Sequence, residues 1–150
     1  MYKVVVSDLD GTLLNSDQEV SELSKKVIRE LHNRGIKFYI ATGRAYPDAK
    51  RIMESIGIKI PLISANGGVI NDVDGNEIYR DDLDEESKNI VLDIDYMAVS
   101  DLIHINVYSD NRWFLTTEER KVNPFKEEPH FTSEIRPIEE LRKRNITKIY

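Results

Sequence analysis

Two aspartates spaced two residues apart follow a short apolar run near the N-terminus. The run Val4–Val6 continues into S-D-L-D-G-T, which contains Asp8, Asp10, Gly11 and Thr12. In an extended chain a spacing of two places both carboxylates on one side, and the glycine lets the backbone turn sharply beside a ligand. Converging carboxylates favour a hard cation with oxygen ligands, such as Mg²⁺. The same residue types also shape ordinary turns, so this stretch alone leaves both interpretations open.

A second stretch with chemical potential is A-T-G-R, which closes the apolar segment Ile36–Ala41. The hydroxyl of Thr42 and the amide of Gly43 would stand at the end of a strand, directly before a helix. Such groups bind phosphate oxygens well, because the amides at a helix start point toward the anion. Helix capping is the commoner role of a lone T-G pair.

A third stretch, S-A-N-G-G, repeats this arrangement after the apolar segment Pro61–Ser64, with Asn66 and Gly67 at its centre. Three successive predicted strands therefore end in small polar residues and glycine. In open α/β sheets, ligands bind beyond the carboxyl ends of the strands. The coincidence predicts one site for an anion and a metal at one edge of the sheet.

The spacing of apolar residues predicts the elements that position these side chains. Strands are expected at Lys3–Ser7, Ile36–Ala41 and Pro61–Ser64, with helices between them. One helix would begin near Ser16 or Asp17 and end before Gly35, and the other would span Ala45–Ile56. This alternation is typical of an α/β fold with a doubly wound parallel sheet, whose first strand is covered on both faces. Two more segments, Val69–Asn71 and Glu77–Arg80, predict a hairpin.

The pattern changes after the hairpin to an α+β arrangement, so we expect a domain boundary near Asp81–Leu83. An acidic start suits the N-terminus of a helix that would extend through Val99. The remaining predicted elements are strands at Asp101–Tyr108, Arg112–Thr116 and Ile146–Tyr150, and short helices at Thr117–Lys126 and Ile138–Lys143.

Composition excludes several classes of function. The 150 residues carry a net charge of −6 and no cluster of lysine and arginine, which predicts poor binding to nucleic acid and to anionic membranes. There is no cysteine, so disulfides and thiolate chemistry are excluded. The start of the chain does not resemble a signal peptide, and no apolar run reaches the length of a membrane span. A cytoplasmic location is expected.

Taken together, D-L-D-G-T-L-L, A-T-G-R and I-S-A-N-G-G make the chain resemble the haloacid dehalogenase superfamily, in particular its Cof-type phosphatases. The motifs cover roughly residues 1–80. Cof-type proteins insert a large α+β cap of the C2 type after the third strand, and the second half resembles the start of one. The resemblance therefore implies the N-terminal half of a Rossmann-like hydrolase core at residues 1–81 and a partial cap at residues 82–150.

The resemblance also implies roles for the first two motifs. Asp8 would be the nucleophile that forms an aspartyl-phosphate. Asp10 would protonate the leaving oxygen and then activate water. Mg²⁺ would be held by the Asp8 carboxylate and the Asp10 backbone carbonyl. The Leu9 amide, the Thr42 hydroxyl and the Gly43 amide would hold the phosphoryl oxygens.

On the substrate side, the resemblance implies that Asn66 and Gly67 line the site beneath the cap. For Arg44 two positions remain open, one near the substrate or cap and one in a solvated or helix-side salt bridge. The implied substrate is a small phosphorylated metabolite, either a sugar phosphate or a nucleotide.

Two further motifs of the family have no counterpart in these residues: a lysine beside the nucleophile and an acidic G-D-x-x-N-D pair that completes the magnesium shell. We therefore expect a truncated member of the family. An alternative to an active phosphatase is an incompetent product that keeps the phosphate pocket and self-associates through its exposed first strand. Phosphomutase or phosphonatase chemistry is a third possibility, which the pair A-T-G-R and S-A-N-G-G disfavours.

Overall fold

The chain divides into two compact units, Met1–Arg80 and Asp81–Tyr150. The structure is a computed structural model that describes residues 2–100, 103, 105–116 and 133–150. Within these residues no helix is both long and apolar enough to cross a membrane. Each unit has its own sheet and its own buried cluster.

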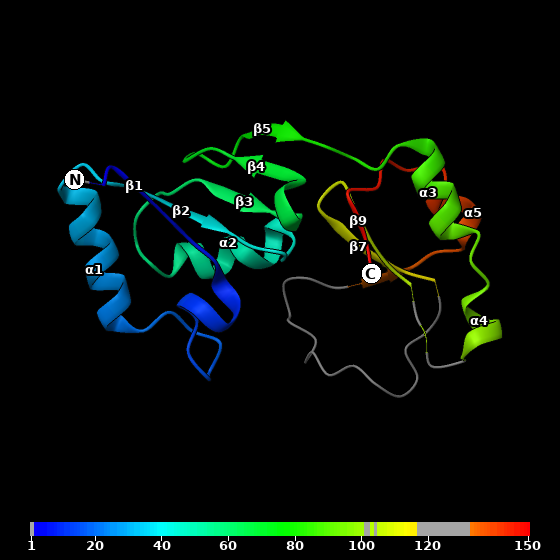
Figure 1. The fold of residues 1–150 in the computed structure, drawn as a ribbon, viewed down its shortest axis with the longest axis horizontal. Coiled ribbons are helices and arrows are strands. Elements are labelled where there is room, and N and C mark those ends of the chain that lie inside the picture. Colours follow the sequence, from blue (N-terminus) through cyan, green and yellow to red (C-terminus); the bar gives the residue numbers. More distant parts are fainter. Residues whose placement is uncertain (1, 101–102, 104, 117–132) are drawn as a thin grey trace. The chain divides into compact units, whose positions relative to one another are not determined.

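The first unit is built on a five-stranded sheet, which Figure 1 shows in the blue to green part of the chain. Neighbours follow the chain in the order β1-β2-β3-β4-β5, with the first three strands parallel and the last two antiparallel. This confirms the predicted α/β class. The strands are β1 (Val4–Ser7), β2 (Lys37–Ala41), β3 (Leu62–Ser64), β4 (Val69–Asn71) and β5 (Glu77–Arg80).

Two helices, α1 (Glu22–Asn33) and α2 (Tyr46–Glu54), connect the parallel strands and pack on one face of this sheet (Figure 1). Two right-handed crossovers that advance in the same direction place both helices on the same side. Among the described residues, the other face therefore has no helix over β1, and Val4 and Val6 are 49% and 56% exposed. This corrects the expectation that the first strand is covered on both faces. The shared cluster contains Ile28 of α1, Phe38 and Ile40 of β2, and Ala49, Ile52 and Met53 of α2.

The start of α1 differs from the prediction at Ser16 or Asp17, because a hairpin precedes the helix. The Asn15 side chain accepts hydrogen bonds from the amides of Asp17 and Glu19 at 3.0 and 2.9 Å. An isolated bridge then pairs Leu14 with Val20. The helix begins only after Ser21, whose hydroxyl caps it by accepting from the Ser24 amide.

Both helices of this unit end within a few residues of the glycine that follows them, Gly35 for α1 and Gly57 for α2. Gly35 follows α1 with φ of +73°, the left-handed conformation expected of a glycine just past a helix. The helix α2 is shorter than predicted and ends at Glu54 before a turn. Leu23 and Val27, which share the helical spacing of buried Ile28, are exposed.

The second unit contains a four-stranded sheet and short helices. The sheet has the order β8-β7-β6-β9. In Figure 1, α3 and α5 lie beside one another, and the Arg142 side chain donates to Asn89 across them at 3.0 Å. The elements are α3 (Glu85–Leu92), α4 (Tyr96–Val99), β6 (Asn106–Ser109), β7 (Arg112–Leu115), β8 (Ser133–Ile135), α5 (Ile138–Leu141) and β9 (Lys148–Ile149).

Two expectations for this unit are corrected by the structure. The long helix predicted through Val99 is broken into α3 and α4, because Asp95 caps a new helix by accepting from the Ala98 amide. The strand β8 was not predicted, since Ser133–Ile135 contains only one apolar residue and shows no recognisable alternation. The helix predicted at Thr117–Lys126 lies outside the described residues.

We expect the buried face of the first sheet to dominate the stability of its unit. Ile40 of β2 is fully buried, whereas Ile78 of β5 is 64% exposed. Replacing Ile40 by alanine should lower the free energy of unfolding by ~2–5 kcal/mol, because a cavity remains. Chemical denaturation followed by circular dichroism measures the change. The matched variant Ile78→Ala should cost less than ~1 kcal/mol, and equal losses for the two variants would contradict this packing.

Candidate active site

The carboxyl ends of β1, β2 and β3 meet at one edge of the first sheet, because the three strands are parallel. A pocket of about 410 Å³ lies at this edge and takes residues from all three strand ends. The structure thus brings together polar groups that are far apart in the sequence. The lining residues are Asp8, Ala41, Thr42, Gly43, Ile63, Asn66 and Gly67.

The turn after β1 orients the aspartate pair by burying the residue between them. Leu9 has no exposed surface and belongs to the core cluster, whereas Asp8 and Asp10 are exposed. A single helical turn, η1 (Leu9–Leu13), follows, and the Leu14 amide closes it by donating to the Leu9 carbonyl at 2.9 Å. Gly11 has φ of +70° in this turn, a conformation that costs glycine little. Leu9 is therefore the anchor of the pair, and its amide is the group predicted to hold phosphate.

Thr42, at the end of β2, is 95% buried and tied to both neighbouring segments. Its amide donates to the Ile63 carbonyl at 2.9 Å, and its carbonyl accepts from the Asn66 amide at 3.1 Å. Its hydroxyl oxygen accepts from the Arg44 amide at 3.2 Å. A hydroxyl that accepts in this way keeps its own hydrogen for donation. Thr42 thus combines a fixed position with a donor at the pocket wall.

The turn after β3, η2 (Ala65–Gly67), holds three consecutive residues at positive φ. Asn66 at +59° is a residue that tolerates this region, but Ala65 at +50° is strained by its Cβ. The Ala65 amide donates to the Arg44 carbonyl at 2.8 Å, which holds the turn against the β2 end. Backbone strain of this kind concentrates at functional sites, and here it brings Asn66 and Gly67 to the pocket.

Arg44 points its guanidinium at the aspartate pair. It forms a two-pronged ion pair with Asp10, from Nε to Oδ2 at 2.8 Å and from Nη2 to Oδ1 at 2.6 Å. Its Nη1 contacts both oxygens of Asp48 at 3.1 and 3.2 Å, and Nη2 also donates to Gln18 Oε1 at 2.7 Å. The helix-side salt bridge was one of the two positions left open by the sequence. The contact with Asp10 was not predicted.

This ion pair changes the acid–base character of Asp10. The hydrogen bond from Arg44 lowers the pKa of the Asp10 carboxyl, against a smaller opposing effect of burial. The same hydrogen bond raises the pKa of the Arg44 guanidinium. In this conformation Asp10 is therefore held as a carboxylate, which can accept a proton but has none to give.

Asp8 and Asp10 carry oxygen atoms of the type that Mg²⁺ binds. Mg²⁺ in proteins is commonly bound through one or two carboxylates and retains several waters. The Asp8 carboxylate and the Asp10 backbone carbonyl could supply such a partial shell, since the Asp10 carboxylate is engaged by Arg44. Within the described residues, no group of three or more histidine, cysteine, aspartate or glutamate side chains could hold a metal.

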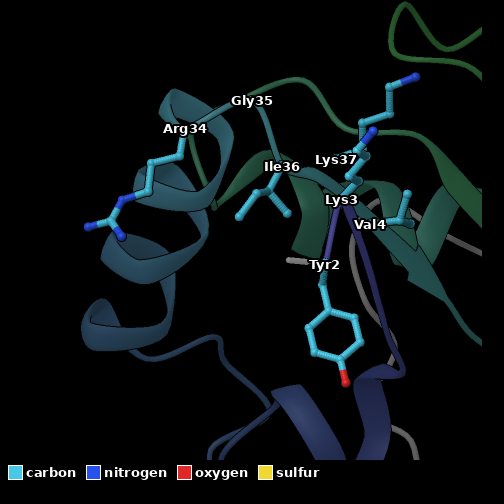
Figure 2. A pocket seen from close by; sticks show the side chains of 7 residues that line it. All are labelled: Tyr2, Lys3, Val4, Arg34, Gly35, Ile36 and Lys37. Carbon is cyan, nitrogen blue, oxygen red and sulfur yellow. The ribbon is translucent and has the colours of Figure 1, made fainter.

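A second cavity, of about 430 Å³, lies at the opposite ends of β1 and β2 (Figure 2). Its lining contains cationic, apolar and one phenolic side chain but no carboxylate and no amide side chain, so it lacks the paired carboxylates of the first pocket. The residues are Tyr2, Lys3, Val4, Arg34, Gly35, Ile36 and Lys37.

Five of the residues predicted from the sequence line one pocket: Asp8, Thr42, Gly43, Asn66 and Gly67. Two residues at the site escaped sequence analysis, Gln18 and Asp48. Asp48 stands four residues after Arg44 on α2, a spacing that could have indicated an ion pair. No comparable signal exists for Gln18, because a hairpin that the sequence did not predict carries it to Arg44.

The chain is similar to curated phosphatases. It is 35% identical over 150 residues to a putative phosphatase of Buchnera aphidicola subsp. Baizongia pistaciae, covering 100% of this chain and 55% of the relative. It is 32% identical over 114 residues to an HMP-PP phosphatase of Yersinia pestis, covering 76% of this chain and 41% of that protein. The chain spans about half the length of the curated relatives that it matches.

The chain is also similar to solved structures and matches a family profile. A Thermotoga maritima crystal structure matches 99% of this chain and 55% of its own, at 25% identity and a TM-score of 0.78. A haloacid dehalogenase-like hydrolase from Bacillus subtilis matches 79% of this chain and 40% of its own, at 33% identity and a TM-score of 0.68. The profile of haloacid dehalogenase-like hydrolases matches residues 5–150. The chain therefore belongs to the family of haloacid dehalogenase-like hydrolases.

Proposed function

We propose that the chain carries the phosphate site of a Mg²⁺-dependent phosphomonoester hydrolase that works through an aspartyl-phosphate. One observation supports this most strongly. The exposed carboxylate of Asp8 shares a pocket with Thr42 and Gly43 of one strand end and with Asn66 and Gly67 of another. A nucleophile facing hydroxyl and amide donors is the arrangement that phosphoryl transfer requires, because its catalysis depends on positioning and charge stabilisation.

In the first step of this proposal, an oxygen of the Asp8 carboxylate attacks phosphorus. The bond from phosphorus to the leaving oxygen breaks, and protonated Asp10 gives its proton to that oxygen. The Thr42 hydroxyl and the amides of Leu9 and Gly43 donate to the phosphoryl oxygens, where they stabilise the charge that redistributes in the transition state.

In the second step, water attacks the phosphorus of the aspartyl-phosphate, and the bond to the Asp8 oxygen breaks. Asp10, now a carboxylate, accepts the proton of the water. The ion pair with Arg44 stabilises this charged form, so the conformation in the structure suits the hydrolytic step better than the first. Mg²⁺, when bound at Asp8 and the Asp10 carbonyl, neutralises charge between the carboxylate and the phosphate.

The proposed substrates are small phosphorylated metabolites, either sugar phosphates or nucleotides. The relatives named phosphatases support the reaction class, and the relative named HMP-PP phosphatase supports a small phosphorylated substrate. We assign the second unit to a C2-type cap as part of this proposal, on the basis of its α+β elements. The lack of cysteine supports a cytoplasmic location.

Hydrolysis of p-nitrophenyl phosphate with Mg²⁺ tests the proposed reaction. We expect Asp8→Asn to lower the rate to background, because the amide is a far weaker nucleophile. Thr42→Val should lower the rate by about 10²-fold through loss of one donor, and chelation of Mg²⁺ should abolish turnover. The control Asp17→Asn changes an exposed hairpin residue and should be neutral. Equal rates for the original chain and Asp8→Asn would refute the assignment of the nucleophile.

The acid–base role of Asp10 predicts a coupled titration. Replacing Arg44 by glutamine should raise the pKa of Asp10 toward the ordinary range of an aspartate, because the ion pair is lost. Carbon-detected NMR of the side-chain carboxyl in the metal-free protein measures this pKa. Arg34 pairs with Glu30 instead, so Arg34→Gln should leave it unchanged. An unaltered Asp10 titration in Arg44→Gln would show that the ion pair is absent in solution.

As a second proposal, these 150 residues self-associate through β1, independently of any catalysis. The specific observation is that β1 is an edge of the sheet among the described residues and exposes Val4 and Val6. Exposed apolar edge strands pair readily with other chains, because their outward amides and carbonyls lack strand partners. The opposite edge, β5, carries Glu77 and Arg80, and charged side chains disfavour such pairing.

Sedimentation over a range of concentrations tests this second proposal. We expect reversible association that Val6→Lys weakens by at least ~10-fold in dissociation constant, about 1.4 kcal/mol. The matched variant Ile78→Lys places the same charge on the β5 edge and should not alter association. A chain that stays monomeric at all concentrations, or that responds equally to both variants, would exclude pairing through β1.

A further inference from the structure

The guanidinium of Arg44 is fixed by three side chains from three different segments. Asp10 comes from the turn after β1, Asp48 from the first turn of α2, and Gln18 from the hairpin before α1. The Nη2 atom carries two hydrogens, and its contacts use both, one to Asp10 at 2.6 Å and one to Gln18 at 2.7 Å. A planar group held at three edges has one orientation, and this orientation presents two parallel donors to Asp10.

Gln18 is the least expected of these partners, because it reaches Arg44 from a strained position. Its φ is +61°, a region that residues with a Cβ rarely adopt. The hairpin that imposes this conformation is closed by Asn15, whose backbone carbonyl accepts from the Gln18 amide at 3.1 Å and whose amide donates to Glu19. The strained backbone of Gln18 thus accompanies a side-chain contact with Arg44, which holds Asp10. This contact is not with the residues proposed to bind phosphate.

An ordinary surface salt bridge would explain the Arg44–Asp48 contact alone, since exposed pairs of this kind contribute ~0–1 kcal/mol. It does not explain the rest of the arrangement. Arg44 has only 21% of its side-chain surface exposed, and it binds Asp10 through two parallel hydrogen bonds. Bidentate pairs of this type add geometric specificity as well as energy.

We propose that Gln18 and Asp48 are positioning residues, which act through Arg44 to aim the Asp10 carboxylate at the water that hydrolyses the aspartyl-phosphate. The proposal rests on the proposed function, because Asp10 has a water to activate only if the site forms an aspartyl-phosphate. Its structural part is independent of turnover: removing Gln18 should loosen the Arg44–Asp10 pair in the resting protein. Gln18 in this way connects the hairpin before α1 to the acid–base residue.

The test variant is Gln18→Asn in the full chain. Asparagine favours positive φ, so the backbone keeps its conformation, but its amide is one methylene shorter and falls short of Arg44. Gln18→Glu keeps an acceptor oxygen at the same reach and serves as the rescue variant. The control Glu19→Ala changes a neighbouring exposed residue of the same hairpin.

The first measurement needs no activity. The Nε–H of Arg44 gives an NMR signal that Arg44→Lys identifies by its loss, and its hydrogen bond to Asp10 slows hydrogen exchange. We expect Gln18→Asn to accelerate this exchange about 5-fold, as for the loss of one hydrogen bond, while Gln18→Glu and Glu19→Ala leave it unchanged. Exchange that Gln18→Asn does not alter would overturn the positioning role.

The second measurement separates the two chemical steps. Rapid mixing of the chain with p-nitrophenyl phosphate and Mg²⁺ reports the first step as an initial release of p-nitrophenolate, and the hydrolytic step as the steady rate that follows. Gln18→Asn should lower the steady rate about 10-fold, because the water loses its aligned base, and should change the initial release less than about 3-fold, because p-nitrophenolate leaves without a proton. Equal losses in the two rates would overturn the proposal. Absence of any Asp8-dependent hydrolysis would refute the proposed function instead, and the exchange measurement would then decide the structural part alone.

Discussion

Parallel hydrogen bonding among β1, β2 and β3 makes three strands stop at the same edge of a sheet. Every group of the candidate active site depends on this constraint. Asp8, Thr42 and Asn66 are more than 20 residues apart in sequence, yet they line one pocket because each follows a strand of the same direction. An antiparallel β2 would place Thr42 at the other end of the sheet, beside the cationic cavity of Figure 2.

The two aspartates have different electrostatic surroundings although only Leu9 separates them. Burial of Leu9 turns both carboxylates outward, and Arg44 then engages Asp10 in a bidentate pair. Asp8 instead lines a pocket together with Thr42 and Gly43. Under the proposed function, this difference would suit one carboxylate to nucleophilic attack and the other to proton transfer, which is how enzymes obtain two functions from one residue type.

Much of the fold and of the candidate site was predictable from the sequence, and the wrong predictions have identifiable causes. The strand positions of the first unit and the glycine after α1 were correct, because apolar runs and Gly35 are local signals. The start of α1 was wrong because Ser16 and Asp17 are capable caps, but the Asn15 side chain closes a hairpin there. The long helix through Val99 was wrong because Asp95 caps a second helix. Competing caps of similar strength cannot be ranked without the packing around them.

The three motifs were enough to predict the family, the α/β class and five of the residues that line the pocket, since the motifs follow the strands directly and parallel strands end together. The contacts of Arg44 with Asp10 and Gln18 became apparent only in the fold. Asp10, Gln18 and Asp48 reach it from three segments, and the contact through Gln18 spans 26 residues and requires the hairpin conformation. Which charges pair across such distances depends on side-chain direction and burial, and these follow from the packed fold rather than from spacing along the chain.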